Sequence, residues 1–251
     1  MAMEHQRKNK PTEEYVSFLE NYQEVTALFI FADIRGFGRW GSQYPQEIKE
    51  LLEIEYSLAR RFFDGSRKKS HRKKLVKLVG DGFFAANEVG DRRTSDLTQA
   101  FTESANDILD FVGNFNEALS KTVLHDKHEI GVGFGMSYGT GYRFNLSGFG
   151  TDYIGVQVNI ASRLCSVANS SELVLEYNLG DYAEDALIER LHKLRIDEDT
   201  INMKETNDFR VYRVGKLYEE LKKPQHYIGV DKLVTTIKKG RKVNRNLPKL
   251  F

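Results

Sequence analysis

The chain has 251 residues, of which 40% are hydrophobic and 29% are charged, enough for one domain with a sizeable core. Its formal net charge of +1 argues against a surface that coats nucleic acid, so we expect no nucleic-acid partner. The polar first residues, and the lack of any run near the ~18 to 20 apolar residues of a membrane span, predict a cytoplasmic protein with no membrane partner. The single Cys165 excludes an intrachain disulfide and a multi-cysteine metal site.

The first half of the chain predicts two helices, a strand and a hairpin. Segment 12–23 has the apolar spacing of a short amphipathic helix, Val25–Ile34 is continuously apolar like a buried strand, and helical spacing returns from near Pro45 to Phe63. After a basic loop at 67–74, the segments LVKLV and FFAANEV flank a Gly-Asp-Gly turn. Asp-Gly tolerates the positive φ angles of tight turns, so this pattern predicts a hairpin.

The second half alternates between helices and strands. In chain order the pattern predicts a helix over Thr94–Val123, strands over Ile130–Tyr138 and Tyr142–Leu146, a helix over Val156–Val167, a strand at ELVLEY, a helical stretch, and a hairpin near Ile201–Met203 and Phe209–Val214. The order strand, helix, hairpin, helix, strand predicts an α+β fold with a ferredoxin-like core, in which helices flank an antiparallel-rich sheet.

The first motif that carries chemistry is Phe-Ala-Asp-Ile-Arg-Gly-Phe, residues 31–37. A buried strand delivers Asp33 to its end, and a glycine-containing turn follows at once. A carboxylate at this place can hold a divalent cation, while the exposed N–H groups of the turn can face phosphate oxygens. The alternative is an aspartate that only caps the next turn.

The second motif is Lys-Leu-Val-Gly-Asp-Gly, residues 77–82, which puts Asp81 at the tip of the predicted hairpin. Taken alone, Asp81 is better explained as a common turn residue. Together with Asp33 it changes the interpretation, because two acidic residues at the ends of apolar strands in one small domain suit a two-metal site for phosphoryl transfer.

The third motif is the segment from Asp152 to Leu164, DYIGVQVNIASRL. Asn159 and Arg163 are four residues apart on the predicted helix and therefore project from one face. An arginine there can stabilise charge on a transferring phosphoryl group, and an asparagine can bind a sugar oxygen. The alternative is a solvated helix face on which Arg163 pairs with an acidic neighbour.

Together, the three motifs in this order resemble the class III adenylate/guanylate cyclase family over roughly Val25 to Val214. In that family two catalytic domains pair head to tail, so the resemblance implies a homodimer with two equivalent sites that bind a nucleoside triphosphate.

The resemblance also implies two divalent cations, Mg²⁺ or Mn²⁺, on Asp33, Asp81 and the carbonyl of Ile34. The substrate contacts implied are Gly36, Phe37 and Lys204 at the phosphates and, from the partner protomer, Lys77 and Asp152 at the base, Asn159 at the ribose and Arg163 at the α-phosphate.

The implied reaction is attack of the ribose 3′-hydroxyl on the α-phosphorus with loss of pyrophosphate. The implied organisation is an N-terminal helical extension over 1–24, a nucleotide cyclase catalytic domain over 25–216 and a basic C-terminal extension over 217–251. Two positions depart from the family pattern. Residues 204–207 read Lys-Glu-Thr-Asn where the family has Lys-Gly-Lys-Gly, and Gly38 stands where most members have threonine.

The base is indicated by Lys77 and Asp152, a hydrogen-bond donor and an acceptor. Adenine and cytosine present the matching edge, whereas guanine and uracil present the reverse order.

With no sensor domain expected, the chain also resembles stand-alone bacterial pyrimidine cyclases of the Pycsar anti-phage type, whose product activates an effector. Tyr56 or Trp40 could narrow the pocket to a one-ring base, although ordinary core packing explains both. We favour a pyrimidine triphosphate, with ATP as the alternative.

Two other functional classes compete with this interpretation. A diguanylate cyclase would need a Gly-Gly-Asp/Glu-Glu-Phe hairpin, and residues 79–83 lack its second acid. A catalytically silent nucleotide-binding regulator would be favoured by loss of a metal aspartate or of Arg163, and all three residues are present. The six histidines lack the spacing of a metal site, so none is assigned as a ligand.

Overall fold

The computed structural model describes residues 22–64, 73–90, 94–121, 130–146, 150–203 and 206–222. Three sequence predictions therefore lie largely or wholly outside the described residues: the helix over 12–23, the basic loop at 67–74, and the basic extension after residue 222. Lys204 lies outside them as well. No helix within the described ranges is both long and apolar enough to cross a membrane.

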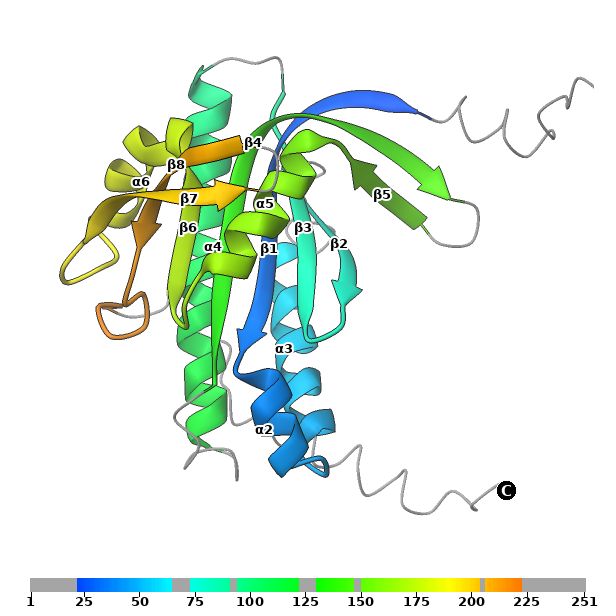
Figure 1. Ribbon diagram of the computed structural model, residues 1–251, viewed down its shortest axis with the longest axis vertical. Helices are drawn as coiled ribbons and strands as arrows, with labels where there is room; N and C mark the ends of the chain where they lie inside the picture. Colours follow the sequence, from blue (N-terminus) through cyan, green and yellow to red (C-terminus); the bar gives the residue numbers. More distant parts are fainter. Residues whose placement is uncertain are drawn as a thin grey trace, which may run out of the picture.

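A single mixed sheet forms the centre of the described fold (Figure 1). Its neighbouring strands run antiparallel except for one parallel pair, β4 with β6. This confirms the predicted α+β class. The strands lie in the order β2 (Lys73–Val79), β3 (Gly82–Glu88), β1 (Gln23–Arg35), β4 (Gly131–Leu146), β6 (Glu172–Glu176), β8 (Thr206–Val214) and β7 (Ile196–Met203), with β5 (Gly150–Ile154) paired to the end of β4.

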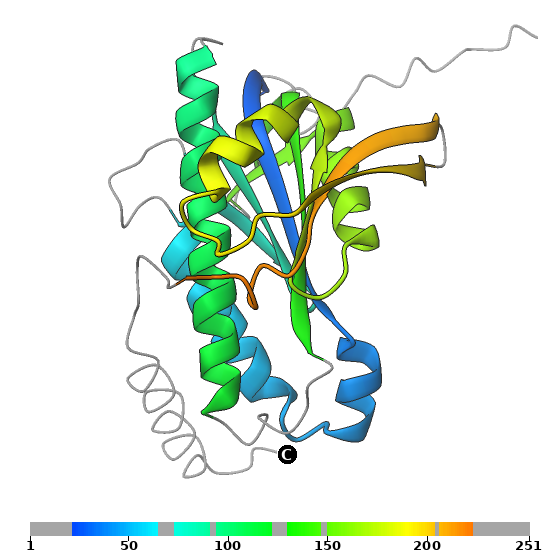
Figure 2. The ribbon, with the colours of Figure 1, turned by 90° about the vertical axis from the view of Figure 1, so that its left-hand side faces the viewer.

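The helices cover the sheet unequally. The long helices α3 (Ile48–Phe63) and α4 (Thr94–Ser120) pack together, and α6 (Gly180–Leu187) packs against α4. On the opposite side α5 (Val156–Val167) lies against β4, β1 and β6. Figure 2 shows α4 and α5 on opposite sides of the sheet. The short elements α2 (Phe37–Gln43) and η2 (Tyr177–Leu179) follow β1 and β6 directly.

Strand β1 is buried on both faces, which explains its continuous apolar sequence. Successive side chains of a strand point to opposite sides. Leu28, Ile30 and Ile34 join the large core under α3 and α4. Phe29 belongs to a smaller cluster with residues of α5, and Phe31 packs against it. The alternation places the next odd-numbered residue, Asp33, on the side of α5.

Three features of the fold differ from the sequence predictions, and one of them is strand β5, which forms where no strand was predicted. The predicted strands Ile130–Tyr138 and Tyr142–Leu146 are one continuous strand, because β4 stays paired with β1 from Gly131 to Arg143 through Gly139 and Gly141. A side chain at Gly141 would collide with the ring of Phe29, since a Cβ there would lie 2.6 Å from Cζ. These glycines therefore serve close packing inside a strand rather than a turn. The structure also adds α2, where only a turn was predicted.

We predict that Gly135→Ala destabilises the domain by roughly 1–3 kcal/mol, the usual cost of forcing extra volume into a packed core. A Cβ at Gly135 would lie 2.0 Å from the backbone nitrogen of Cys165 and 2.4 Å from the carbonyl oxygen of Ala161, so α5 must move away from β4. Urea unfolding measures the change. Gly215→Ala is the matched control, because nothing lies within 4 Å of its added Cβ. Equal stability of the two variants would contradict this packing argument.

Candidate active site

Strand β1 delivers Asp33 into an open pocket between the sheet and α5. The Asp33 side chain is 40% exposed, unlike the apolar residues that precede it. The pocket has a volume of about 190 Å³ and is lined by Phe31, Ala32, Asp33, Val79, Ser162, Cys165 and Ser166. A carboxylate at the end of a buried strand therefore reaches a space that can hold a ligand.

Asp81 is brought next to Asp33 by the turn between β2 and β3. Val79 pairs with Gly82, so Gly80 and Asp81 form the turn, and the Ile34 N–H donates a hydrogen bond to the Asp81 carbonyl at 3.0 Å. This bond joins the two segments that carry the acidic residues. The structure thus brings together Asp33, Ile34 and Asp81, the three residues predicted to hold metal ions.

The hairpin itself is correctly predicted, but its conformational reason differs. The positive φ of 62° belongs to Gly80, whereas neither Asp81 nor Gly82 adopts a positive φ. Gly82 is required for another reason. A Cβ at this position would lie 2.2 Å from the carbonyl oxygen of Ala32, so only glycine lets β3 approach β1 this closely beside Asp33.

The electrostatics of the two aspartates suit a cation. Burial and the charge of Asp81 raise the pKa of Asp33, while an ion pair with Arg35 at 3.3 Å opposes that rise. A bound divalent cation would relieve this repulsion. Among the described residues no three His, Cys, Asp or Glu side chains are grouped as metal ligands. Two carboxylates and a backbone carbonyl fit ions that keep water and phosphate oxygens as further ligands.

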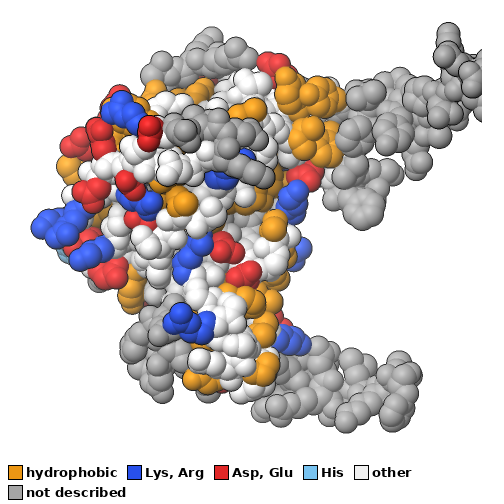
Figure 3. Space-filling view, in the orientation of Figure 1, with side chains coloured by type: hydrophobic (Ala, Val, Ile, Leu, Met, Phe, Trp, Pro, Cys, Tyr) orange, Lys and Arg blue, Asp and Glu red, His pale blue; other side chains and the backbone are white. Residues whose placement is uncertain are grey.

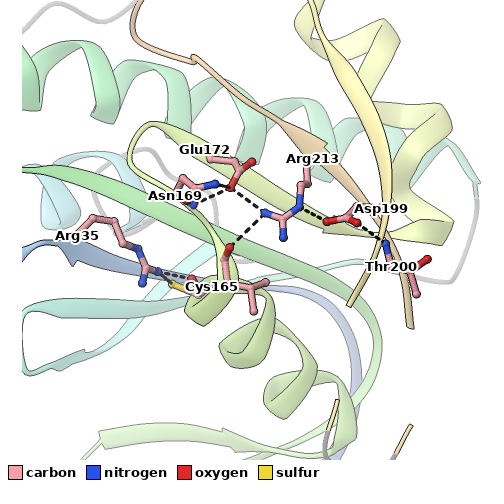
Figure 4. Close-up of polar contacts among 8 residues, drawn as sticks. Arg35, Cys165, Asn169, Glu172, Asp199, Thr200 and Arg213 are labelled. Atoms are coloured by element: carbon pink, nitrogen blue, oxygen red, sulfur yellow. Dashed lines mark hydrogen bonds and ion pairs between the residues drawn. The ribbon is translucent and has the colours of Figure 1, made fainter. Parts of the chain in front are cut away.

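Arg35, which the sequence analysis did not single out, links strand β1 to α5. Its guanidinium donates a hydrogen bond to the Cys165 carbonyl and lies 3.4 Å from the Cys165 Sγ (Figure 4). The thiol is 4% exposed, and burial raises its pKa to about 12, so Cys165 stays neutral and packs as a small apolar side chain.

The C-terminal end of α5 is held from β8 by Arg213. Its guanidinium donates to the Val167 carbonyl at 3.2 Å and to the Glu172 carboxylate at 2.9 Å, and it contacts Asp199 at 2.6 Å (Figure 4). Together with Arg35 on the other side, this network fixes the position of the helix that carries Asn159 and Arg163.

Asn159 and Arg163 lie on α5 three residues before Ser162 and Ser166, the two serines that line the Asp33 pocket. Asn159 is exposed and Arg163 is half-buried. Within the described part of the chain neither side chain has a hydrogen-bonding or ionic partner, so the predicted alternative, an Arg163 paired with an acidic neighbour, is not observed there. Neither residue lines the pocket at Asp33. One chain therefore does not gather all the predicted catalytic residues around one pocket.

The predicted base-contacting residues do meet. Lys77 on β2 and Asp152 on β5 form a hydrogen-bonded ion pair with an Nζ–Oδ2 distance of 2.6 Å. Both side chains are accessible, at 46% and 22% exposure. Their donor and acceptor are thus presented side by side at the surface, as a heterocyclic edge requires.

The predicted phosphate contacts are only partly described. Gly36 has a φ of 76°, which turns the chain from β1 into α2, and Phe37 begins that helix. The segment after Asp33 therefore bends sharply beside the pocket, as the sequence predicts.

Glu55 on α3 is a further acidic residue that the sequence analysis missed. It is 0% exposed, and burial together with the charges of Asp81 and Asp33 raises its pKa to about 8. The available signal was an acidic residue in the apolar stripe formed by Leu51, Ile54 and Leu58.

This burial predicts a pH-dependent stability of the metal-free protein. The folded-state pKa of Glu55 is about 8 against an ordinary 4.5, so the folded state binds the extra proton between these values and stability falls as pH rises through that window. The slope from one such proton is at most about 1.4 kcal/mol per pH unit. In the wild type the midpoint of thermal unfolding in EDTA should therefore fall from pH 5 to 8.5, and Glu55→Gln should make this fall shallower. Parallel curves for Glu55→Gln, the wild type and the control Glu53→Gln would contradict the assignment.

Comparison with known proteins gives the same fold. The chain resembles the adenylyl cyclase CyaB from P. aeruginosa, with 17% identity and a TM-score of 0.56 over 77% of this chain and 95% of that one. It also resembles the guanylyl cyclase Cya2, with 17% identity and a TM-score of 0.58 over 80% and 98% of the two chains. A third similar structure is the catalytic core of a rhodopsin-guanylyl cyclase with converted specificity in complex with ATPαS, with 17% identity and a TM-score of 0.51 over 77% and 97%.

None of the curated proteins matches the chain significantly. A family model, the adenylate and guanylate cyclase catalytic domain, matches residues 18–216 and so includes the strands, helices and turns that place the site. Members of this family generally use divalent metal ions. On this match, the chain belongs to the adenylate and guanylate cyclase catalytic domain family and is a nucleotide cyclase.

Proposed function

We propose that this cyclase converts a pyrimidine nucleoside triphosphate, UTP or CTP, into a 3′,5′-cyclic nucleotide and pyrophosphate at the interface of a homodimer. The observation that carries the proposal is the division of the site on one chain. Asp33 lines the pocket and Asp81 is held beside it through the Ile34 N–H, whereas Arg163 and Asn159 do not line the pocket and their side chains have no partners among the described residues. A second copy, turned head to tail, would supply the missing half.

The surface around the ion pair of Lys77 and Asp152 supports a dimer. Four large hydrophobic side chains are exposed beside these two residues in the sequence: Leu78, Val79, Ile154 and Val156, the last at 72%. Figure 3 shows hydrophobic side chains exposed on the side of the molecule where β2 and β5 lie. Apolar groups clustered around accessible polar residues are typical of an interface core rather than of free surface.

The chemistry follows from the two halves. Asp33, Asp81 and the Ile34 carbonyl would hold two Mg²⁺ or Mn²⁺ ions, which activate the ribose 3′-hydroxyl and neutralise phosphate charge when bound. Asn159 from the partner protomer orients the ribose. The 3′-oxygen forms a bond to the α-phosphorus and gives its proton to solvent, and the bond to the β-phosphate oxygen breaks to release pyrophosphate. Arg163 from the partner protomer stabilises the charge that develops on the α-phosphate.

The base preference rests on Lys77, Asp152 and Tyr56. The ammonium and carboxylate match the ring nitrogen and exocyclic amine of cytosine or adenine. The Tyr56 hydroxyl donates to the Gly80 carbonyl, which fixes an aromatic ring against the hairpin that carries Lys77. We infer that this ring favours a one-ring base. Trp40 does not contribute, because it is 5% exposed in the core and packs against Phe37 and Tyr44.

Cyclic AMP is the second candidate product, since adenine offers Lys77 and Asp152 the same edge as cytosine. The proposed cellular role, activation of an effector in anti-phage defence, rests on the resemblance of the sequence to pyrimidine cyclases of the Pycsar type. Product identity decides between the two candidates and therefore comes before any test in cells.

We predict that the purified chain with Mn²⁺ makes one cyclic nucleotide when ATP, GTP, CTP and UTP are supplied separately and products are identified by mass spectrometry. Cyclic CMP or cyclic UMP is the expected product, and cyclic AMP would establish the second candidate instead. Asp33→Asn and Asp81→Asn should each lose at least about 100-fold in turnover, because each removes a metal-binding carboxylate. Near-normal turnover in either variant would show that the two-metal assignment is wrong.

The shared site predicts complementation between two inactive chains. Asp33→Asn and Arg163→Ala should each be inactive alone. An equal mixture, refolded or co-expressed, should recover roughly a quarter of the wild-type activity, because half of the dimers are mixed and each mixed dimer has one intact site. A mixture of two preparations of Asp33→Asn is the matched control. If the mixed variants stay inactive although they form dimers, each site is built from one chain and the head-to-tail arrangement is wrong.

A further inference from the structure

Glu55 is a buried carboxylate that core packing does not explain. It lies in the apolar stripe of α3 with 0% exposure, and within the described residues neither of its carboxylate oxygens has a hydrogen-bond partner. A buried polar group without partners is destabilising, and an apolar residue of similar size would pack better at this point. An acidic residue at this position is therefore best explained by a ligand or an ordered water that its carboxylate can bind.

The surroundings of Glu55 point to the metal site. The charges of Asp81 and Asp33 both act on it. The next residue, Tyr56, contacts the Gly80 carbonyl, so this turn of α3 lies against the β2–β3 turn that carries Asp81. The three acidic residues, from α3, β1 and that turn, therefore lie within electrostatic reach of one another, and Arg35 forms an ion pair with Asp33.

We propose that Glu55 is a third carboxylate of the metal site, which acts through ordered water and helps to hold the divalent cations at Asp33 and Asp81. It is a positioning residue rather than a direct ligand, because the described His, Cys, Asp and Glu side chains include no group of three arranged to ligate one ion. The inference rests on the proposed function insofar as Asp33 and Asp81 are the primary ligands.

The physical argument is electrostatic. A negative charge buried among two others is unfavourable on its own, and two divalent cations reverse the sign of the local field. Water bound to a cation is a strong hydrogen-bond donor, so it can satisfy the oxygens of Glu55 that lack partners. The same residue that weakens the empty site then strengthens the loaded one. A purely structural Glu55 would give the first effect without the second.

The test is Mn²⁺ binding to the full-length chain without nucleotide, measured by isothermal titration calorimetry. Glu55→Gln should weaken Mn²⁺ binding by roughly 10-fold or more, the usual effect of removing an outer partner of a metal site. Its unfolding midpoint in EDTA should be equal to or above that of the wild type. Glu55→Asp, which keeps the charge, should recover part of the affinity. Glu53→Gln is the matched control, since it removes a partly exposed carboxylate from the same helix.

A kinetic readout separates this role from general damage to the site. In Glu55→Gln the Mn²⁺ concentration that gives half-maximal activity should rise, while KM for the nucleotide at saturating Mn²⁺ should stay within about twofold of the wild type. If the half-maximal Mn²⁺ concentration and KM for the nucleotide rise by the same factor, Glu55 has a structural role and the proposal is overturned. An unfolding midpoint in EDTA well below that of the wild type would lead to the same conclusion.

The aspartate variants distinguish failure of this inference from failure of the proposed function. If Asp33→Asn and Asp81→Asn lose Mn²⁺ binding while Glu55→Gln binds like the wild type, the two-metal site stands and the role of Glu55 is wrong. If Asp33→Asn and Asp81→Asn both bind Mn²⁺ normally, the metal assignment fails and the role of Glu55 fails with it.

Discussion

The backbone hydrogen bond from Ile34 to Asp81, 3.0 Å long, is the constraint on which the site depends. It fixes the end of β1 against the β2–β3 turn and so keeps two carboxylates together despite their mutual repulsion. The sheet supplies the rigidity, because β1 is paired along its length with β3 and β4. The pKa of Asp33 is raised by burial and by Asp81, so the fold stores an unfavourable interaction that a cation can relieve.

The position of α5 is the second requirement, and it is set by close packing and by two arginines. Gly135 lets the helix backbone lie directly on β4, while Arg35 and Arg213 hold its C-terminal end from opposite sides. Arg35 and Arg213 are therefore both engaged in contacts that hold the helix. Arg163 is left with no partner in the described part of the chain. A half-buried guanidinium without an anionic partner is suited to bind an anion such as a phosphate group.

Much of this arrangement could be predicted from the sequence because the signals are local. The apolar run before Asp33, the glycine-flanked turn at Asp81 and the four-residue spacing of Asn159 and Arg163 each follow from strand, turn and helix geometry. The continuity of β4 through Gly139 and Gly141 could not be predicted, since these glycines make room for Gln157 and for the ring of Phe29, two contacts that exist only in the folded chain. Arg35 and Glu55 were missed for the same reason. What makes them unusual is a contact or a burial that exists only after the chain folds.

The charge distribution supports the proposal that two chains together form a working unit. The carboxylates of Asp33, Asp81 and the buried Glu55 act on one another, whereas Arg163 on α5 has no counterion among the described residues. If Arg163 lay in the Asp33 pocket of its own chain, it would neutralise the carboxylates directly and exclude the cations. In the proposed homodimer the arginine and the carboxylates meet only across the twofold interface, so metal ions and a triphosphate, rather than a salt bridge, would balance the charges. Under the proposed head-to-tail arrangement, turnover requires assembly of the dimer.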